Sequence, residues 1–479
     1  MRGAKLLIGT ILAVVAAGCA RPPAAYGPVP TPGQLRWQES EMNMFCHFGP
    51  NTFTGKEWGD GDESEALFNP TQMDCRQWAR VARQTGFSSI VVTAKHHDGF
   101  CLWPSKYSSH TVAHSPWKEG EGDVLKELAA ACAGEGIGMG VYLSPWDRNA
   151  PSYGTPEYNE VFAGMLGEVL SGYGEISEQW FDGANGEGPN GKRQKYDWEL
   201  FNSTVAKLQP DAVIFSDVGP GCRWVGNESG VAPDSCWATL NTKGFEPGKA
   251  PSADVLGHGN RKGKEWIPAE VDVSIRNSWF WQPGEHPKTL AELLRIYYTS
   301  VGRNAVLLLN VPPDRRGLID PEDSLRLVEF RTALDSIFSH NMADGARFET
   351  SSDYNHLYRA QNLALAFDGF WAAGKADSEP VINVELPEGR TFNRIVLQEA
   401  IAFGQRVENF KIEYLAPDGS WKALTSGSTI GHKRILQIPM VTTSGLRITF
   451  HRSLAPPVIK SVALYRDNYQ MDGEQPLGE

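Results

Sequence analysis

Short apolar runs alternate with amphipathic helix patterns over most of the chain, and this alternation constrains the fold more than any other feature. Between about residues 34 and 342, runs of strand length are followed by segments in which apolar residues recur every three or four positions. The segment 123–134, for example, places Val124, Leu125 and Leu128 on one face of a helix. Such alternation indicates a parallel sheet with helices packed against it.

The number of strand candidates favours a closed barrel. Seven are clear, and an eighth is expected near Arg223 or within 237–240. A doubly wound sheet is the alternative, but no Gly-rich phosphate-binding loop follows the first strand candidate. A (β/α)8-type barrel over residues 34–342 is therefore the simplest architecture. The seven candidates are 43–48, 89–94, 137–143, 176–181, 212–215, 271–275 and 305–310.

The pattern changes after a helix expected at 321–339. Short runs then alternate between apolar and polar residues with a period of two, separated by turns such as Pro417-Asp418-Gly419. This pattern predicts an antiparallel β-sandwich over residues 343–479. The segment looks similar to discoidin-like carbohydrate-binding modules, and a packing domain that binds no ligand is the alternative.

The amino terminus has the pattern of an export signal. Basic residues precede the apolar run 6–17, which is too short to span a bilayer. The run ends in Ala16-Ala17-Gly18-Cys19, which resembles a lipobox, so residues 1–19 are expected to be a lipoprotein-type signal peptide with lipidation at Cys19. Ordinary signal cleavage is the alternative. Residues 20–33 are rich in Pro, Ala and Gly and are expected to form a flexible tether.

The net charge and the cysteine pattern argue against several classes of binding partner and metal site. The formal net charge is −12, with 57 acidic and 45 basic residues, which argues against a nucleic-acid or anionic-lipid surface. Membrane contact is expected only through a lipid at Cys19, and the sequence does not indicate an oligomeric state. The six other cysteines form no C-x-x-C pair, so buried free thiols are expected rather than a zinc site. No metal or organic cofactor is expected.

Polar side chains follow several strand candidates at the point where each ends. His47 follows the first, Lys95-His96-His97-Asp98 the second, and Asp182 the fourth. In a barrel these ends lie on one face, where active sites are built. The adjacent histidines suit hydrogen bonds to hydroxyl groups better than a metal, because neighbouring residues of a strand point to opposite faces.

A second carboxylic acid completes a candidate catalytic pair with Asp182. Glu228 lies in a Gly-rich loop close to Trp224, and an apolar neighbour raises the pKa of a carboxyl group so that it can act as an acid. Glu265 and Glu270 are alternative candidates for this acid. Two carboxyl groups in different environments are what retaining glycoside hydrolysis requires.

These segments together resemble glycoside hydrolase family 29, the α-L-fucosidases, over essentially the whole barrel. The order of the motifs along the chain makes the resemblance specific. They are His47-Phe48-Gly49, Glu57-Trp58-Gly59, Phe68-Asn69-Pro70, residues 93–100 (TAKHHDGF), residues 140–146 (GVYLSPW), Trp180-Phe181-Asp182-Gly183, residues 223–228 (RWVGNE) and residues 300–305 (SVGRNA).

The resemblance implies a retaining exo-glycosidase acting on a fucosylated oligosaccharide or glycoconjugate, with Asp182 as nucleophile and Glu228 as acid/base. The Gly-Asn-Glu segment resembles the branch that prefers α-1,3- and α-1,4-linked fucose. An α-L-galactosidase on the same barrel and an inactive glycan-binding protein are the alternatives. The residues expected to line the fucose site are His47, Glu57, Trp58, His96, His97, Tyr142, Trp180 and Trp224.

Overall fold

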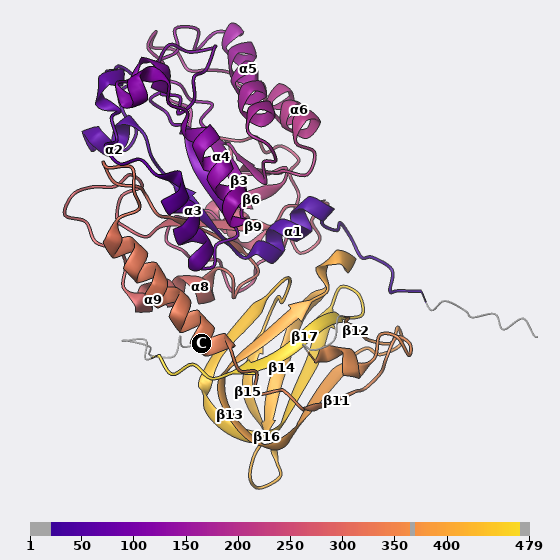
Figure 1. Cartoon of the computed structure of the whole chain (residues 1–479). Coiled ribbons are helices and arrows are strands. Elements are labelled where there is room, and N and C mark those ends of the chain that lie inside the picture. The colour runs from indigo at the N-terminus through magenta and orange to yellow at the C-terminus, as the bar shows by residue number, and fades with distance from the viewer. Residues whose placement is uncertain (1–20, 365–368, 470–479) are drawn as a thin grey trace, which may run out of the picture.

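The computed structural model describes residues 21–364 and 369–469. The expected signal peptide and Cys19 lie outside the described residues. The chain forms a parallel barrel with a β-sandwich below it, as Figure 1 shows.

Eight parallel strands close the barrel, and each pairs with its predecessor along the chain until the last pairs with the first. The (β/α)8-type prediction is confirmed. The eighth strand is Cys222–Trp224, at one of the two expected places, whereas Thr239–Leu240 (β7) pairs with Glu265–Trp266 (β8) outside the barrel. The barrel strands are β1 (Met42–Cys46), β2 (Ser89–Lys95), β3 (Gly138–Leu143), β4 (Glu178–Trp180), β5 (Val213–Ser216), β6 (Cys222–Trp224), β9 (Ala269–Ser274) and β10 (Val306–Asn310).

Local sequence signals set the limits of the surrounding helices. In α4, the Asp123 side chain accepts a hydrogen bond from the Lys126 N–H, and Gly136 ends the helix in a left-handed conformation with φ of 67°. The apolar face of α4 is buried, as the sequence predicts. The helices are α1 (Pro32–Ser40), α2 (Pro50–Thr54), α3 (Cys75–Gln84), α4 (Val124–Glu135), α5 (Glu157–Gly172), α6 (Trp198–Leu208), α7 (Ala253–His258), α8 (Leu290–Thr299) and α9 (Pro321–Phe338).

The C-terminal domain is antiparallel throughout, which confirms the predicted sandwich. Its two longest strands extend beyond the short alternating runs of the sequence, and their pairing with each other contains register shifts. A separate apolar core lies inside this domain. The strands are β11 (Arg347–Thr350), β12 (Trp371–Ala372), β13 (Val381–Glu399), β14 (Val407–Leu415), β15 (Trp421–Gly427), β16 (Arg434–Ser453) and β17 (Val458–Tyr465).

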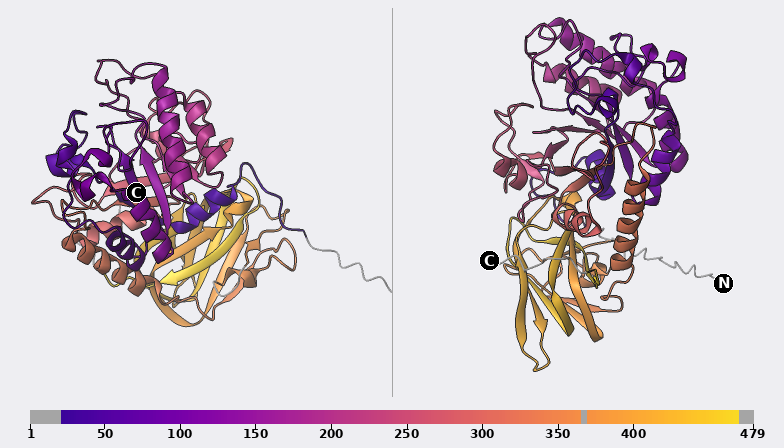
Figure 2. Two further views of the ribbon diagram at one scale, coloured as in Figure 1. Left: turned by 45° about the horizontal axis from the view of Figure 1, so that its top comes forward. Right: turned by 90° about the vertical axis from the view of Figure 1, so that its left-hand side faces the viewer.

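Buried polar contacts join the two domains, which lie directly against each other in the views of Figure 2. Gln405 accepts a hydrogen bond from the Ala238 N–H at 2.7 Å, and Arg434 donates to the Asp234 carboxylate at 2.6 Å. Tyr298 donates to Asp467 at 2.8 Å. The first two contacts attach the segment after β6 to the sandwich, and the third attaches helix α8.

The N-terminal stretch also packs on the sandwich, which differs from the flexible tether expected for residues 20–33. The Tyr26 N–H donates to the Phe403 carbonyl at 3.0 Å, and Arg406 donates to the Ala24 carbonyl at 2.6 Å. Pro23 is buried. Residues 21–30 form no regular element, but the Ala24 carbonyl and the Tyr26 N–H find hydrogen-bond partners on the sandwich.

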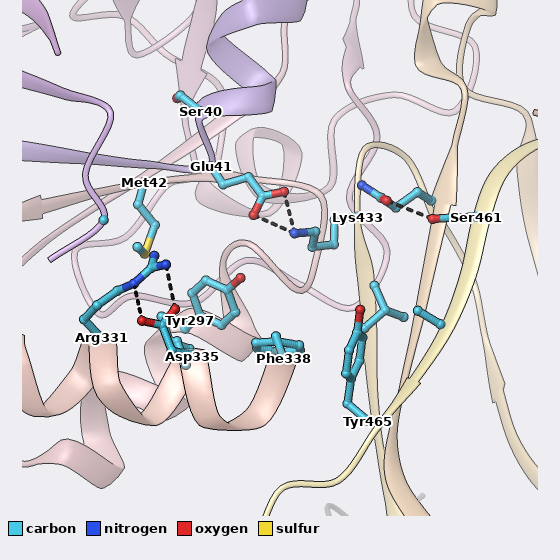
Figure 3. A pocket seen from close by; sticks show the side chains of 15 residues that line it. Ser40, Glu41, Met42, Tyr297, Arg331, Asp335, Phe338, Lys433, Ser461 and Tyr465 are labelled. Atoms are coloured by element: carbon cyan, nitrogen blue, oxygen red, sulfur yellow. Dashed lines mark hydrogen bonds and ion pairs between the residues drawn. The ribbon is translucent and has the colours of Figure 1, made fainter. Parts of the chain in front are cut away.

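A cavity of about 420 Å³ lies between the domains, and Figure 3 shows its lining. Glu41 of the barrel pairs across it with Lys433 and His432 of the sandwich. Burial alone would raise the pKa of Glu41, but the two cationic partners outweigh it and lower the pKa to about 2. The contacts of Glu41 with Lys433 and His432 therefore stabilise the association of the two domains most when Glu41 is ionised.

We expect Glu41→Gln to lower the free energy of unfolding by roughly 2–3 kcal/mol at pH 7 and by almost nothing near pH 2. A lowered pKa contributes stability above the unfolded value of about 4.3 and loses it as the pH falls through the folded value. Urea unfolding at several pH values measures the difference. An equal effect at pH 7 and pH 2 would contradict the pairing.

The cysteines are buried and unpaired among the described residues, as expected for Cys46, Cys75, Cys101, Cys132, Cys222 and Cys236. Within the same part of the chain, no helix has the length and apolar character needed to cross a membrane.

Candidate active site

A pocket of about 180 Å³ opens at the carboxyl ends of the barrel strands. It is smaller than the roughly 300–1,000 Å³ typical of pockets for drug-sized ligands, so it suits one small ring rather than an extended chain. The pocket brings together nine of the ten predicted site residues. Its lining is Phe45, His47, Glu57, Trp58, His96, His97, Tyr142, Trp180, Asp182, Ala184, Glu228, Asp272 and Trp279.

Asp182 lies two residues after the end of β4, with its side chain about one quarter exposed to the pocket. Its Oδ2 atom accepts a hydrogen bond from the Tyr142 hydroxyl at 3.0 Å, and its Oδ1 atom accepts one from the Ala184 N–H at 2.7 Å. The His97 Nε2 atom lies 3.7 Å from Oδ2. These contacts orient the carboxylate while leaving it accessible to a ligand.

His47 and His97 present the same ring atom to the pocket. The Asn310 amide donates to Ser274 and to a carbonyl, so its oxygen accepts from His47 Nδ1 at 2.9 Å. His97 Nδ1 pairs with the Ser144 hydroxyl, which itself donates to a carbonyl. In both rings Nδ1 therefore carries the proton and Nε2 can accept a hydrogen bond from a sugar hydroxyl.

All three pocket histidines are neutral at physiological pH. Burial lowers the pKa of His47 to about 3 and that of His97 to about 4, and it lowers the pKa of His96 well below its ordinary value. Neutral imidazoles suit hydroxyl groups, which need both donors and acceptors. Among the described residues, the three histidines belong to no cluster of potential metal ligands.

Aromatic rings form the walls of the pocket. The Trp180 ring stacks on Phe215 with centroids 4.0 Å apart and on Tyr142 at 5.1 Å. Glu57 accepts hydrogen bonds from the Trp279 N–H. Trp58 is 59% exposed at the rim, edge-on to His97. A flat apolar wall with charged and polar groups opposite it is suited to a pyranose ring.

Glu228 reaches the pocket from the loop after β6. Partial burial raises the pKa of its carboxyl group, a hydrogen bond from Trp279 opposes this, and the charge of Asp182 raises it further. The two alternative candidates for the acid lie outside this pocket. Glu265 is exposed on β8, and Glu270 is buried inside the barrel; neither lines the pocket.

Trp224, the tenth predicted residue, does not line the pocket. Its indole N–H donates to Asp272 at 2.8 Å, so it contacts the site through that carboxyl group. Sequence reasoning missed Asp272 and Trp279. Asp272 is a polar position between Val271 and Val273 of a barrel strand, which is a signal for a side chain that points into a polar site.

Asp272 is a neutral acid at pH 7. Burial and the nearby Glu228 carboxyl group raise its pKa to about 8. It can therefore donate a hydrogen bond to a ligand while it accepts one from Trp224. Three carboxyl groups that line the pocket, those of Glu57, Glu228 and Asp272, thus have pKa values raised chiefly by burial.

We expect Asp272→Asn to keep kcat/KM within about fivefold of the wild type, because asparagine can both accept from Trp224 and donate to a ligand. Asp272→Ala leaves the Trp224 N–H without its acceptor, which costs about 1–3 kcal/mol, or roughly tenfold or more in kcat/KM. Steady-state kinetics on a fucosylated oligosaccharide measure both variants. Equal losses in the two would contradict this role.

The α-L-fucosidase family model matches residues 29–335. An α-L-fucosidase 1 of Arabidopsis thaliana is 44% identical over 450 residues, which cover 92% of this chain and 88% of the plant protein. The chain belongs to glycoside hydrolase family 29, the α-L-fucosidases. It is accordingly an α-L-fucosidase, a glycoside hydrolase.

Further relatives and the second domain fit this membership. The structure of a Ruminococcus gnavus family 29 fucosidase in complex with fucose is 33% identical, with a TM-score of 0.86, and covers 95% of this fucosidase and 98% of that chain. A human plasma α-L-fucosidase is 32% identical over 377 residues, 73% of this chain and 69% of the human protein. The F5/8 type C domain model matches residues 347–458, inside the sandwich.

Proposed function

We propose that this enzyme is a retaining exo-α-L-fucosidase that removes terminal α-1,3- or α-1,4-linked fucose from oligosaccharides or glycoconjugates. Asp182 attacks the anomeric carbon to form a glycosyl-enzyme ester, and Glu228 protonates the leaving oxygen. Water then attacks the ester, and Glu228 takes its proton. The observation that carries the proposal is the pairing of an accessible carboxylate with a carboxyl group of raised pKa in one small pocket.

The pocket size and its rim support the exo mode and the substrate class. About 180 Å³ suits one sugar ring, and Trp58 at the rim offers an exposed aromatic face to the next sugar. The bound fucose in the Ruminococcus gnavus relative supports fucose as that ring. The acceptor atoms of His47 and His97 are suited to its hydroxyl groups.

A panel of fucosylated oligosaccharides tests the linkage. We expect trisaccharides with α-1,3- or α-1,4-linked fucose to be cleaved at least about tenfold faster in kcat/KM than an α-1,2-linked fucoside. Faster cleavage of the α-1,2 linkage would contradict the proposal. The matching L-galactoside serves as the control for the C6 position, and it is expected to react more slowly.

Proton NMR during hydrolysis tests the stereochemical outcome. The first free sugar is expected to be α-fucose, because two inversions at the anomeric carbon give net retention. β-Fucose as the first product would contradict the double displacement.

We also propose that the enzyme is an exported lipoprotein anchored through Cys19. Asn355 of the sandwich donates to the Arg21 carbonyl at 3.4 Å, only two residues after the lipobox cysteine. Two extended residues span at most about 7 Å, so the anchor would hold the sandwich close to the membrane surface. Cys19→Ser should release the enzyme from the membrane fraction; unchanged membrane association would contradict the anchor.

A further inference from the structure

Two glutamate side chains meet inside the barrel at a place that the hydrolytic steps above do not use. Glu178 of β4 and Glu270 of β9 are 1% and 0% exposed, and the Cys222 thiol of β6 lies beside them. One polar atom from each of the three side chains lies within 4.8 Å of the others. No basic side chain forms an ion pair with either carboxyl group among the described residues.

The hydrogen bonds of this pair leave two oxygens facing the same small space. Glu270 Oε1 accepts from the Trp180 indole N–H at 2.9 Å, and Glu178 Oε2 accepts from the Trp37 indole N–H at 3.0 Å. Glu178 Oε1 and Glu270 Oε2 are buried and have no donor within the described residues. One proton between these two oxygens would satisfy both, as donor on one side and acceptor on the other.

Electrostatics favours one charge on the pair over two. Two buried carboxylates in contact without a cation carry a large desolvation and repulsion cost. Burial raises the pKa of Glu178 to about 7, and burial together with Glu178 raises the pKa of Glu270 well above its ordinary value. Burial also keeps the Cys222 thiol protonated.

The pair is connected to the active site through Trp180. The Trp180 ring lines the pocket and stacks on Tyr142, and the Tyr142 hydroxyl donates to Asp182 at 3.0 Å. The Trp180 ring also stacks on Phe215, and the hydrogen bond of its indole N–H adds a directional contact to this packing. Glu270 is the acceptor of this indole N–H.

We propose that Glu178 and Glu270 share one proton and act together as a singly charged acceptor that positions Trp180, and through it Tyr142 and Asp182, for hydrolysis of the fucoside. Both are positioning residues. Each carboxyl group holds one indole N–H, and the shared proton locks the two together.

Glutamine substitutions test the shared proton. In Glu178→Gln or Glu270→Gln, an amide N–H replaces the shared proton, while each indole keeps an oxygen acceptor. Each single variant is therefore expected to retain kcat within about threefold and KM unchanged. In the double variant, two indole donors occupy both amide oxygens, and the two NH₂ groups face each other without an acceptor. Its kcat is expected to fall at least about thirtyfold, with a smaller change in KM.

Infrared spectroscopy of the folded proteins separates this role from a general effect on stability. The C=O stretch of one protonated carboxylic acid should disappear in either single variant, and the double variant should lose no further band. Circular dichroism confirms that each variant is folded. If the double variant does not fold, the protonated-acid band in the two single variants still decides whether the proton is shared.

Four results would overturn the proposal. The first is a protonated-acid band unchanged in both single variants, and the second is a further band lost in the double variant. The third is one equivalent of metal in the purified wild-type protein that is absent from Glu178→Gln, because a cation would then occupy the space assigned to the proton. A kcat of the double variant equal to the product of the single effects would remove the positioning role.

Discussion

Asp182→Asn is expected to fold normally and to lose at least about 1,000-fold in kcat, because an amide cannot form the glycosyl-enzyme ester. The amide oxygen can still accept from the Ala184 N–H, and the amide NH₂ can donate to the Tyr142 hydroxyl oxygen, so the pocket should keep its shape and its affinity for fucose. Steady-state kinetics and isothermal titration with fucose measure the two effects separately.

Asp217→Asn is the matched control for this variant. Asp217 is a carboxyl group close to Asp182 that does not line the pocket, and it accepts a hydrogen bond from the Gly248 N–H. Its substitution is expected to change kcat by less than about threefold. A similar loss in the two variants, or near-wild-type turnover by Asp182→Asn, would show that the reaction does not use Asp182 as proposed.

Glu228→Ala is expected to lose about 100- to 10,000-fold in kcat on oligosaccharides, because the leaving oxygen then departs without a proton. An aryl fucoside with a good leaving group needs no such proton and should still form the ester. Azide should then accelerate breakdown of the ester and give a fucosyl azide of retained configuration. Product analysis by NMR with and without azide measures this rescue.

Glu265→Ala is the matched control for the acid. Glu265 was an alternative candidate from the sequence, but it is exposed on β8 and does not line the pocket. It is expected to show wild-type kinetics and no response to azide. Azide rescue in Glu265→Ala, or the absence of rescue in Glu228→Ala, would contradict the assignment of Glu228 as the acid/base.

The sequence predicts the barrel well because most of its strands lie in short apolar runs that alternate with helices. The sequence predicts the limits of strands less well where a strand is very short or very long. The three-residue strand β6 contains Arg223, a charge that is fully buried only because carbonyl groups from several loops accept its hydrogen bonds. In the sandwich, the alternation of apolar and polar residues predicts two separate strands, 435–438 and 446–450. In the structure both lie in the single strand β16.

The residues of the candidate site also differ in how well the sequence predicts them. Residues at strand ends, such as His47 and Asp182, can be predicted because parallel strands bring their ends together. Asp272 has a weaker signal, a single polar position inside an apolar strand, which places its side chain in the barrel but has no motif around it that indicates a role. Trp224 was placed in the lining because it precedes Glu228 in the loop, but its indole N–H turns to Asp272. Side-chain direction at such positions depends on contacts distant in sequence.

Trapping of the covalent intermediate tests the central claim most directly. A fluorinated fucosyl fluoride reacts with the nucleophile and slows hydrolysis of the resulting ester, so intact-protein mass spectrometry should show one added deoxyfluorofucosyl group. Peptide mapping should place that group on Asp182, and Asp182→Asn should remain unlabelled. A label on another residue, or turnover of the reagent without any covalent adduct, would contradict the account.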